Sequence, residues 1–385
     1  MGHSAGELLA LAALALAASY SILTLAALIG WKLRRPVRRA GPERPPVTVL
    51  KPLCGAEPGL YENLRSFCEQ DYPQFQLVFG VQDSNDAALL VVERVMSEFP
   101  SVPIQLVVSP LQHGSNRKVS NLINMLPRAS HDILAISDSD ACVGPDYLNQ
   151  ITLPLSDPRV GLVTCIYRGV PTRGIWSRLG AMYINEWYIP SVLLAWLFGH
   201  QGFASGLTLC LRRNTLRAIG GLRSLVDHLA DDYRLGELVR GLGLRIELAP
   251  CVLDTEHHEP TLAMLTRHEM RWMRTLQVLK PGGFRCLFVT FSAPLALAGI
   301  ALLPALSPLA PIAWTLFGVS IAGRVILHLA HRLPGERALF ADLWLLPARD
   351  ALVVWIWCRS FFTSRVTWRG QQFDVDAEGI MRTPS

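Results

Sequence analysis

The pattern of hydrophobic and polar positions divides the chain into uncharged end regions and an alternating middle. Residues 8–31 carry no charged side chain, and this run exceeds the about 20 apolar residues that a helix needs to cross a bilayer. A cleaved signal peptide is disfavoured, because no charged segment precedes the run and a signal core has only roughly 7–15 residues. Residues 286–323 are also uncharged, and prolines near their middle predict two spans joined by a turn. The pattern therefore predicts three membrane spans.

Basic residues flank these spans on one side. They follow the first span and lie outside both ends of the second block: Lys32, Arg34, Arg35, Arg38, Arg39, Lys280, Arg285, Arg324, Arg332 and Arg337. Because positive charge marks cytoplasmic flanks, the middle of the chain and its tail are expected in the cytosol. Residues 343–362 are apolar but are divided by Pro347, Arg349 and Asp350, which favours an interfacial or re-entrant helix over a span.

The middle of the chain alternates short apolar runs with segments of helical periodicity. The apolar runs predict strands at residues 47–50, 77–81, 104–108, 133–136, 162–166 and 207–211. The periodic segments predict helices at residues 60–68 and 89–99, one that ends near residue 126, and two more at residues 231–240 and 261–279. This order predicts an α/β fold with a parallel sheet covered by helices on both faces. Residues 176–202, aliphatic and aromatic, suit either the core or, as favoured here, the membrane surface.

Two carboxylates follow the predicted strand at residues 133–136. Asp138 and Asp140, separated by one serine, come just past its carboxyl end, where open α/β sheets bind their ligands. Two carboxylates this close repel each other unless a cation lies between them, and oxygen ligands without Cys or His favour Mg²⁺ or Mn²⁺. The alternative is an ordinary Asp-Ser-Asp turn that binds no ligand.

Further polar residues are expected at the same edge of the sheet. Asp83 follows the strand at residues 77–81 and suits a hydrogen bond to a planar base or a ribose, although it or Asp86 equally suits a helix N-cap. Lys118 ends a polar loop, residues 113–118, that opens a helix. Such a corner suits a phosphate, and a solvated basic loop is the equal alternative.

Charged residues also mark two later helices. Asp231 and Asp232 open the helix at residues 231–240, where they either complement the helix dipole or supply a base beside a nucleotide sugar. Arg271 and Trp272 lie in the amphipathic helix that precedes the second apolar block. They suit either an interfacial anchor or a pair that places a guanidinium on a diphosphate and an indole against a sugar or lipid.

Composition favours a membrane protein and excludes some partners. Half of the 385 residues are hydrophobic and 17% are charged. The net charge of +5 is small and dispersed, which argues against nucleic acid as a partner. The eight cysteines form no C-x-x-C pair and no metal-ligand spacing, so they are expected to be reduced thiols. Nothing in the chain predicts an oligomeric state.

The order of these motifs is more specific than any one of them. The supporting stretches are Lys51-Pro-Leu-x-Gly55, Gln82-Asp83-x-Asn85-Asp86, Lys118-x-x-Asn121-Leu122, Asp138-Ser-Asp140, Asp231-Asp232-Tyr233 and Arg271-Trp272. Together with the apolar blocks, they resemble a family-2-type glycosyltransferase of the GT-A fold. More narrowly, the chain resembles ceramide glucosyltransferase and its bacterial relatives, including the hopanoid-associated branch. The resemblance runs from the first span to the Trp368-Arg-Gly370 tail.

The resemblance implies an organisation and an activity. It implies a membrane anchor with a basic flank at residues 1–40, a Rossmann-like nucleotide-diphospho-sugar transferase domain at 41–280, and a membrane block with a cytosolic tail at 281–385. The implied reaction is an inverting, metal-dependent transfer of glucose or N-acetylglucosamine from a UDP-sugar donor to a lipid acceptor, ceramide or a hopanoid polyol. The implied location is an integral membrane position, with the catalytic domain on the cytosolic face of a bacterial inner membrane.

The resemblance also implies a role for each residue at the donor site. Asp83 would bind the uracil or ribose of the donor. Asp138 and Asp140 would hold the ribose and the Mg²⁺ or Mn²⁺ ion, with Asp140 the favoured metal ligand. Lys118 and Asp231 would complete the nucleotide-sugar site, although the relatives often have Glu at the position of Asp231.

The remaining implied roles concern the transfer itself. Asp232 would be the general base, Arg271 would face the diphosphate, and Trp272 would line the acceptor site. His268 stands where the family usually has Gln or Arg, which weakens the likeness to processive polysaccharide synthases. Such a synthase, which needs more spans, is one alternative. A non-catalytic membrane scaffold with a nucleotide-binding fold is another, and it is disfavoured because every carboxylate that the chemistry requires is present in order.

Overall fold

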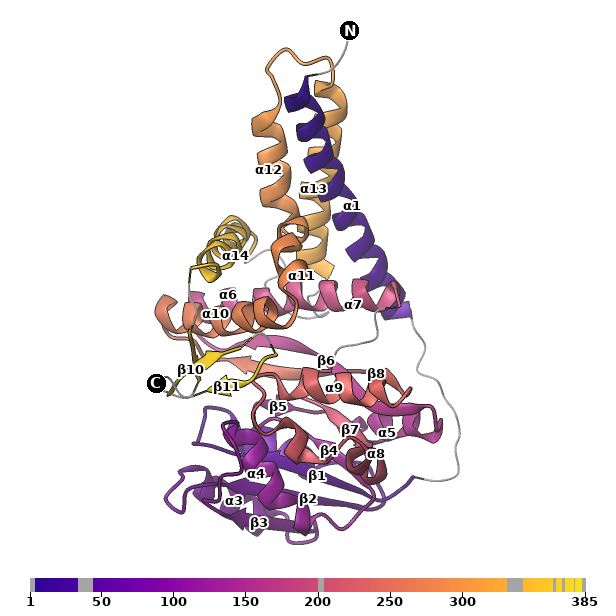
Figure 1. The fold of residues 1–385 in the computed structure, drawn as a ribbon, viewed down its shortest axis with the longest axis vertical. Helices are drawn as coiled ribbons and strands as arrows, with labels where there is room; N and C mark the ends of the chain where they lie inside the picture. Colours follow the sequence, from indigo (N-terminus) through magenta and orange to yellow (C-terminus); the bar gives the residue numbers. More distant parts are fainter. Residues whose placement is uncertain are drawn as a thin grey trace. The chain divides into compact units, whose positions relative to one another are not determined.

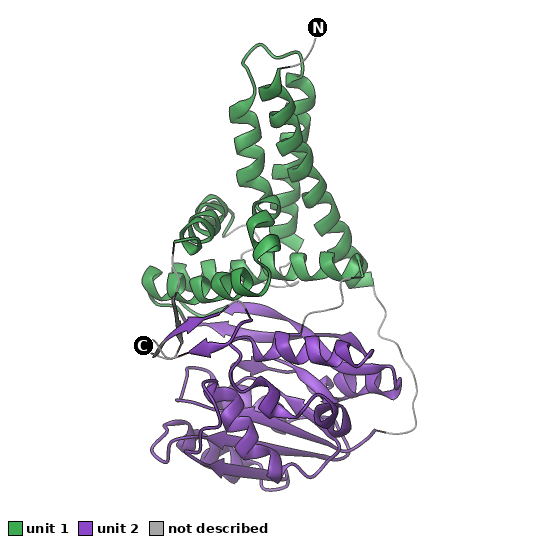
Figure 2. Cartoon of the chain, in the orientation of Figure 1, with its two compact units in different colours: residues 1–34, 171–199, 259–368 green, residues 35–170, 200–258, 369–385 purple. Residues whose placement is uncertain are grey.

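The chain forms two compact units, each drawn from separate stretches of sequence (Figure 2). Unit 1 comprises residues 1–34, 171–199 and 259–368, and unit 2 comprises residues 35–170, 200–258 and 369–385. The division into a membrane anchor (1–40), a transferase domain (41–280) and a membrane block (281–385) describes functional parts of the chain, and it stays a prediction. The structure groups residues 171–199, for which the sequence favoured the membrane surface, with the apolar helices of unit 1.

The computed structural model describes residues 4–33, 44–199, 204–330, 342–362, 365–368, 371–376 and 378–382. Some of the basic residues used above to infer sidedness lie outside these ranges: Arg34, Arg35, Arg38, Arg39, Arg332 and Arg337. Arg369 and Gly370 of the tail motif also lie outside them.

Unit 2 alternates strands and helices. Its elements are β1 (Val47–Pro52), α2 (Leu60–Cys68), β2 (Phe75–Val81), α3 (Ala88–Glu98), β3 (Ile104–Val108), α4 (Arg117–Met125), η1 (Leu126–Arg128), β4 (Ile133–Ile136), β5 (Ala141–Cys142), α5 (Tyr147–Thr152), η2 (Leu153–Ser156), β6 (Val160–Pro171), β7 (Leu209–Arg212), α8 (Arg213–Ala218), η4 (Leu222–Leu225), α9 (Asp231–Gly241), β8 (Arg245–His257), β10 (Gln371–Val375) and β11 (Met381–Arg382). The predicted strands and helices of this region are therefore present, with small shifts at their ends.

An eight-stranded sheet with the strand order β3-β2-β1-β4-β7-β6-β8-β5 organises unit 2. β1 pairs in parallel with β2 and β4, so that Leu50 lies opposite Val78 and Ile136. β7 runs antiparallel to both β4 and β6, and β5 runs antiparallel to β8. The prediction of a parallel sheet is thus wrong beyond β4. A fully buried apolar run reads the same whether its neighbours run parallel or antiparallel, so the sequence pattern does not report strand direction.

Successive residues of the central strands face opposite sides of the sheet and build two hydrophobic cores. Val49 packs with Leu64 of α2 in one core. Leu50, the next residue, packs in the other core with Leu122 of α4 and Leu235 of α9. Helices α4 and α9 lie beside the strands in Figure 1. Burying one such side chain contributes about 1.5–3 kcal/mol, so both faces hold the strand ends in place.

Unit 1 is mainly helical. Its elements are α1 (Ala5–Leu33), α6 (Ile175–Tyr183), the π-helix η3 (Ile184–Tyr188), α7 (Ile189–Leu197), α10 (Leu262–Leu279), α11 (Pro281–Arg285), η5 (Cys286–Thr290), α12 (Ser292–Leu302), α13 (Ala310–Ala330), η6 (Leu343–Leu345), α14 (Leu346–Ser360) and β9 (Arg365–Trp368). Helices α1, α12 and α13 run side by side in Figure 1 and share a core of small and aliphatic residues.

Two described helices, α1 and α13, are long and apolar enough to cross a membrane. A third candidate is the pair Pro281–Thr290 and Ser292–Leu302, which is bent by 71° and counts as one broken span or a re-entrant loop. The three predicted spans are therefore present only if this bent pair is counted as one. Helix α14 has 15 residues and is not among the candidate spans, in keeping with the prediction that this region does not cross as a simple span.

Close approach of α1 to α12 depends on glycine. A Cβ atom at Gly299 would lie 2.7 Å from Leu14 Cγ and 3.1 Å from the Ala10 carbonyl oxygen. The absence of a side chain allows the two helices to pack with their backbones near each other, as small residues do between membrane helices.

We expect Gly299→Ala to lower the thermal midpoint of the detergent-solubilised full chain, because overfilling a packed contact costs about 1–3 kcal/mol. Gly318→Ala is the matched control, since a Cβ atom added at Gly318 of α13 would meet no heavy atom within 4 Å. The control should keep or raise the midpoint, because Ala favours a helix over Gly by about 1 kcal/mol. Equal midpoints for the two variants would contradict the packing argument.

Candidate active site

Lys118 joins three elements at the carboxyl edge of the sheet. Its Nζ lies 2.7 Å from Asp138 Oδ1, just after β4, and 3.2 Å from Asp231 Oδ2, at the start of α9. The lysine and Asp231 side chains are only 13% and 10% exposed, so water screens these pairs little. The sequence left open a solvated basic loop for Lys118, and the structure instead places its ammonium inside an acidic cluster.

Asp140 lies beside Asp138 and is tied to a strand that the sequence did not predict. Its Oδ2 accepts a hydrogen bond from Thr255 Oγ1 of β8 at 3.1 Å. β8 carries charged residues and Pro250, which hid its strand character, but Thr255 pairs with Ala141 of β5. Burial, and next the nearby charge of Asp138, raise the pKa of the Asp140 carboxyl.

The Asp138–Asp140 pair fits a hard divalent cation. Burial and like charge both oppose ionisation of Asp140, and a cation between the carboxylates would relieve both effects. In the part of the chain that the structure describes, no group of three or more His, Cys, Asp or Glu side chains is arranged to hold a metal. Two protein carboxylates suit Mg²⁺ or Mn²⁺ ions, which commonly bind through one or two carboxylates and complete their shell with water and substrate phosphates.

Lys51, to which the sequence assigned no site role, contacts the backbone of this pair. It is fully buried, its Nζ donates to the Asp138 carbonyl oxygen at 2.8 Å, and it stands 3.7 Å over the Phe67 ring. Burial lowers the pKa of Lys51 to about 7, against the opposing pull of Asp140 and Asp138. Its signal in the sequence was the Lys51-Pro-Leu-x-Gly55 stretch, which marked the family without indicating where the ammonium points.

Gly206 links the same cluster to Asp232. Its backbone N–H donates to Asp232 Oδ2 at 3.0 Å, and the Tyr233 N–H donates to Asp232 Oδ1 at 2.7 Å. A Cβ atom at Gly206 would stand 2.8 Å from Asp138 Oδ2 and 3.1 Å from Lys118 Nζ, so a side chain would intrude on the ion pair. Burial, and next the neighbouring Asp231, raise the pKa of Asp232 to about 6.

Hydrogen bonds hold the loop before α9 against the start of α4. Asn116 caps α4 by accepting from the Val119 N–H at 3.0 Å, and its Nδ2 donates to the His228 carbonyl oxygen at 2.8 Å. Asp227 accepts from the backbone and hydroxyl of Ser115 at 2.8 and 2.9 Å. The Met381 N–H donates to the Asp227 carbonyl oxygen at 2.8 Å, so the C-terminal residues of unit 2 secure this loop as well.

Asp83 lies at the same sheet edge, after β2, but outside the Lys118 cluster. Its exposed carboxylate accepts from the Asn85 N–H at 2.9 Å and so closes a local turn. Asp86 accepts from the first N–H of α3, at Ala88, and therefore serves the capping role that the sequence left open for either residue. The carboxylate of Asp83 is thus left accessible at the sheet edge.

Arg271 and Trp272 lie on α10 in unit 1. The Trp272 ring stacks on Tyr183 with ring centroids 5.3 Å apart and an interplanar angle of 18°, and it lies 4.1 Å from the His268 ring. His268 Nδ1 is 2.8 Å from Glu259 Oε1. The residue that replaces the usual Gln or Arg is therefore held by a carboxylate and packs on the neighbouring indole.

Lys118→Met should leave Asp138 and Asp231 without their shared cation. We expect the free energy of unfolding at pH 7 to fall by on the order of 3 kcal/mol, because the desolvated carboxylates lose their partner. Urea titrations followed by tryptophan fluorescence measure this.

The control is Arg65→Met, which removes an exposed ion pair with Glu69 in the same unit. This variant should leave the free energy of unfolding at pH 7 nearly unchanged, because surface ion pairs contribute little to stability. A deficit for Lys118→Met that is no larger than that of the control would argue against a charge cluster at this site.

Comparison with known sequences identifies relatives across most of the chain. The model of "Glycosyl transferase family 21" matches residues 8–381. Ceramide glucosyltransferase 1 of Caenorhabditis elegans is 22% identical over 351 residues, covering 89% of this chain and 74% of the relative. An N-acetylglucosaminyltransferase of Rhizobium leguminosarum bv. viciae is 22% identical over 241 residues, covering 60% of this chain and 55% of the relative.

A solved structure shares the fold. The mannosyltransferase PcManGT from Pyrobaculum calidifontis, in complex with GDP-Man and Mn²⁺, superposes with a TM-score of 0.53 at 20% identity, covering 92% of this chain and 96% of that one. This likeness confirms the predicted GT-A fold, and the family match confirms that the protein is a glycosyltransferase. Because that match spans nearly the whole sequence, the chain belongs to glycosyl transferase family 21.

Proposed function

We propose that this glycosyltransferase moves glucose or N-acetylglucosamine from a UDP-sugar to the hydroxyl of a membrane lipid, ceramide or a hopanoid polyol, with inversion. The observation that carries the proposal is the acidic cluster around Lys118, at the sheet edge where α/β folds bind nucleotides. The ceramide glucosyltransferases among the relatives support a lipid acceptor, and the N-acetylglucosaminyltransferase supports the second sugar.

The donor would bind along the carboxyl ends of the first strands. Asp83, exposed after β2, would accept hydrogen bonds from the uracil or ribose. Lys118, Asp138 and Asp231 would hold the ribose and the diphosphate. A diphosphate would compete with both carboxylates for the Lys118 ammonium, which already lies at this edge and has three donors to offer.

Asp138 and Asp140 would hold Mg²⁺ or Mn²⁺, with Asp140 as the principal ligand. When bound, such an ion supplies positive charge against the charge that develops on the departing UDP. The buried Lys51 ammonium supports the same end of the site by fixing the Asp138 backbone. This contact would help to fix the backbone that carries the two neighbouring carboxylates.

Asp232 would take the proton from the acceptor hydroxyl. Amides of Gly206 and Tyr233 orient its two oxygens, and a pKa of about 6 keeps it ionised yet basic near neutral pH. Attack from the face opposite the diphosphate inverts the anomeric carbon. Arg271 would stabilise the leaving diphosphate, and Trp272, braced by Tyr183, would line the acceptor site.

The lipid acceptor requires contact with a bilayer. The apolar helices α1 and α13 associate the protein with a membrane. Lys32 at the end of α1, Lys280 before the bent pair and Arg285 at the end of α11 support a cytosolic position for the active site. The membrane would be a bacterial inner membrane.

The full chain in proteoliposomes, supplied with UDP-glucose or UDP-N-acetylglucosamine and with ceramide or bacteriohopanetetrol, tests the proposal. We expect one pair to yield a glycolipid by mass spectrometry, with the inverted anomer by NMR. EDTA should abolish the product and Mn²⁺ or Mg²⁺ should restore it. Release of UDP without any lipid product, or undiminished transfer in EDTA, would refute the corresponding part of the proposal.

Asp232→Asn should lower kcat by roughly 10²-fold or more, because the acceptor hydroxyl loses its proton acceptor. In the unmodified enzyme, kcat/KM should fall as the pH drops through about 6, since protonation disables the base. The rate measured from pH 5 to pH 8 shows this slope, which the variant should lack. Asp132→Asn, at a side chain 95% exposed, is the control and should keep the native profile.

A further inference from the structure

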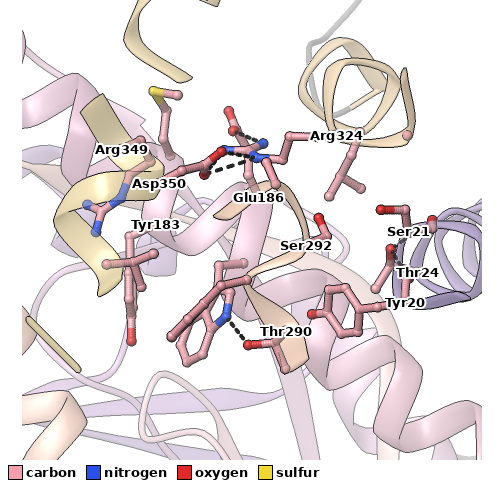
Figure 3. Close-up of a pocket in the computed structure, with 17 residues that line it drawn as sticks. Tyr20, Ser21, Thr24, Tyr183, Glu186, Thr290, Ser292, Arg324, Arg349 and Asp350 are labelled. Carbon is pink, nitrogen blue, oxygen red and sulfur yellow. Dashed lines mark hydrogen bonds and ion pairs between the residues drawn. The ribbon is translucent and has the colours of Figure 1, made fainter. Parts of the chain in front are cut away.

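Unit 1 contains a pocket that none of the proposed donor-site residues lines (Figure 3). Tyr20, Ser21 and Thr24 of α1 form one wall, and α14 contributes Arg349 and Asp350 on another side. Helix α6, the π-helix η3, helix α13 and the bend between η5 and α12 complete it. The space that these residues enclose is about 30 Å³, room for a polar group of roughly the size of a water molecule, and the rest of the hollow is open to solvent.

The pocket is polar, but its cations are already paired. The Arg324 guanidinium makes a bidentate contact with Asp350 at 2.9–3.2 Å, and its Nη1 donates to Glu186 Oε2 at 2.7 Å. The other lining arginine, Arg349, donates to both oxygens of Glu269 at 2.6 and 2.7 Å. Glu186 also lies 2.6 Å from His328 Nδ1, through its Oε1. Both lining guanidinium groups are therefore already engaged by carboxylates and are not free to bind a phosphate.

The rest of the wall offers hydroxyl groups and aromatic rings. The Tyr20 hydroxyl lies 3.0 Å from Ser191 Oγ, and Trp187 Nε1 donates to Thr290 Oγ1 at 2.8 Å. Trp187 also packs 6.2 Å from the Phe291 ring. Neutral donors and acceptors beside apolar rings suit a ligand that carries hydroxyl or amide groups on an apolar body.

Three features connect this pocket with an acceptor lipid. The π-helix η3, a backbone irregularity often found at functional sites, supplies Glu186 and Trp187 to the wall. The lining residue Tyr183, immediately before it, stacks on Trp272. The pocket walls also include residues of α1 and α13, the described helices long and apolar enough to cross a membrane.

We propose that this pocket binds the hydroxyl-bearing head of an uncharged membrane lipid and selects against lipid phosphates. The inference rests on the proposed function and adds to it the place where the acceptor is held. Glu186 and Asp350 would accept hydrogen bonds from the lipid hydroxyl or amide groups, and the same carboxylates would repel a phosphate.

The test fills the pocket. Ala293 of α12 is buried and lines the pocket, whereas Ala298 of the same helix is exposed. Ala293→Leu and Ala298→Leu therefore add the same atoms, the first inside the pocket and the second on the outer surface of the helix. The probe is a short-chain fluorescent ceramide, with its 1-phosphate as the charged counterpart and bacteriohopanetetrol as an unlabelled competitor. Binding to the full chain in detergent is followed by fluorescence anisotropy.

We expect Ala293→Leu to weaken binding of the neutral probe by roughly tenfold and Ala298→Leu to leave it unchanged. The 1-phosphate should bind the unmodified chain at least roughly tenfold more weakly than the neutral probe. The Kd for UDP-glucose should be the same in all three proteins, which separates a pocket effect from misfolding. If Ala293→Leu fails to fold, Tyr20→Phe takes its place. It removes one hydroxyl from the pocket wall and should weaken binding of the neutral probe.

The outcomes distinguish the two proposals. Neutral-probe binding that is unaffected by Ala293→Leu in a chain that still binds UDP-glucose, or equal affinity for the 1-phosphate, overturns the pocket. A lipid that binds in the pocket but is never glycosylated overturns the proposed function and leaves the pocket intact. Transfer to ceramide with an unchanged acceptor KM in Ala293→Leu supports the function and rejects the pocket.

Discussion

The candidate active site depends on one ammonium group shared by two carboxylates. Lys118 comes from α4, Asp138 from the end of β4 and Asp231 from α9, and the hydrophobic cores bring these elements together. Without the lysine, burying these acids so near each other would be costly, because each carboxylate would lose hydration and face a like charge. The ion pairs of Lys118 thus hold the three elements together, and the same ammonium is the positive charge that an anionic substrate would bind.

Unit 1 also contains buried charged side chains that are paired, in this case among apolar helices. Arg324 lies in a candidate membrane span with a side chain only 9% exposed, and Asp350 and Glu186 neutralise it. Ionisable residues at such positions are expensive unless they are paired, and they usually mark a functional path. The arrangement connects α13, α14 and η3, and with them the walls of the unit 1 pocket.

Periodicity predicted the parts of the fold in which burial follows a regular repeat. The strands β1 to β4 are rich in apolar residues, and Asp138 was found because it follows β4, which is apolar throughout. β8 was missed because charges and Pro250 interrupt it, so Thr255 could not be placed beside Asp140. The importance of Gly206 is steric and reaches across the chain, and no local pattern reveals it.

For the same physical reason, the sequence predicted some residues of the site and not others. Asp232 and Trp272 belong to short motifs whose order is informative, whereas the burial of Lys51 under Asp138 follows only from the folded sheet. The antiparallel direction of β7 and the π-helix η3 depend on tertiary packing, which residue type alone does not encode. Motif order therefore predicted the family and fold class, while contact geometry had to come from the structure.

The interleaved course of the chain has a practical consequence for engineering it. Gly379 and Met381, near the end of the chain, bond to the backbone on either side of His228, the loop that leads to the Asp231–Asp232 pair. A soluble fragment cut from the middle of the sequence would keep every acidic residue of the site but lose this fastening. It would also carry residues 171–199 away from the helices with which they pack. Shortened forms of this enzyme should therefore be obtained by internal redesign of the unit 1 segments, not by trimming the two ends.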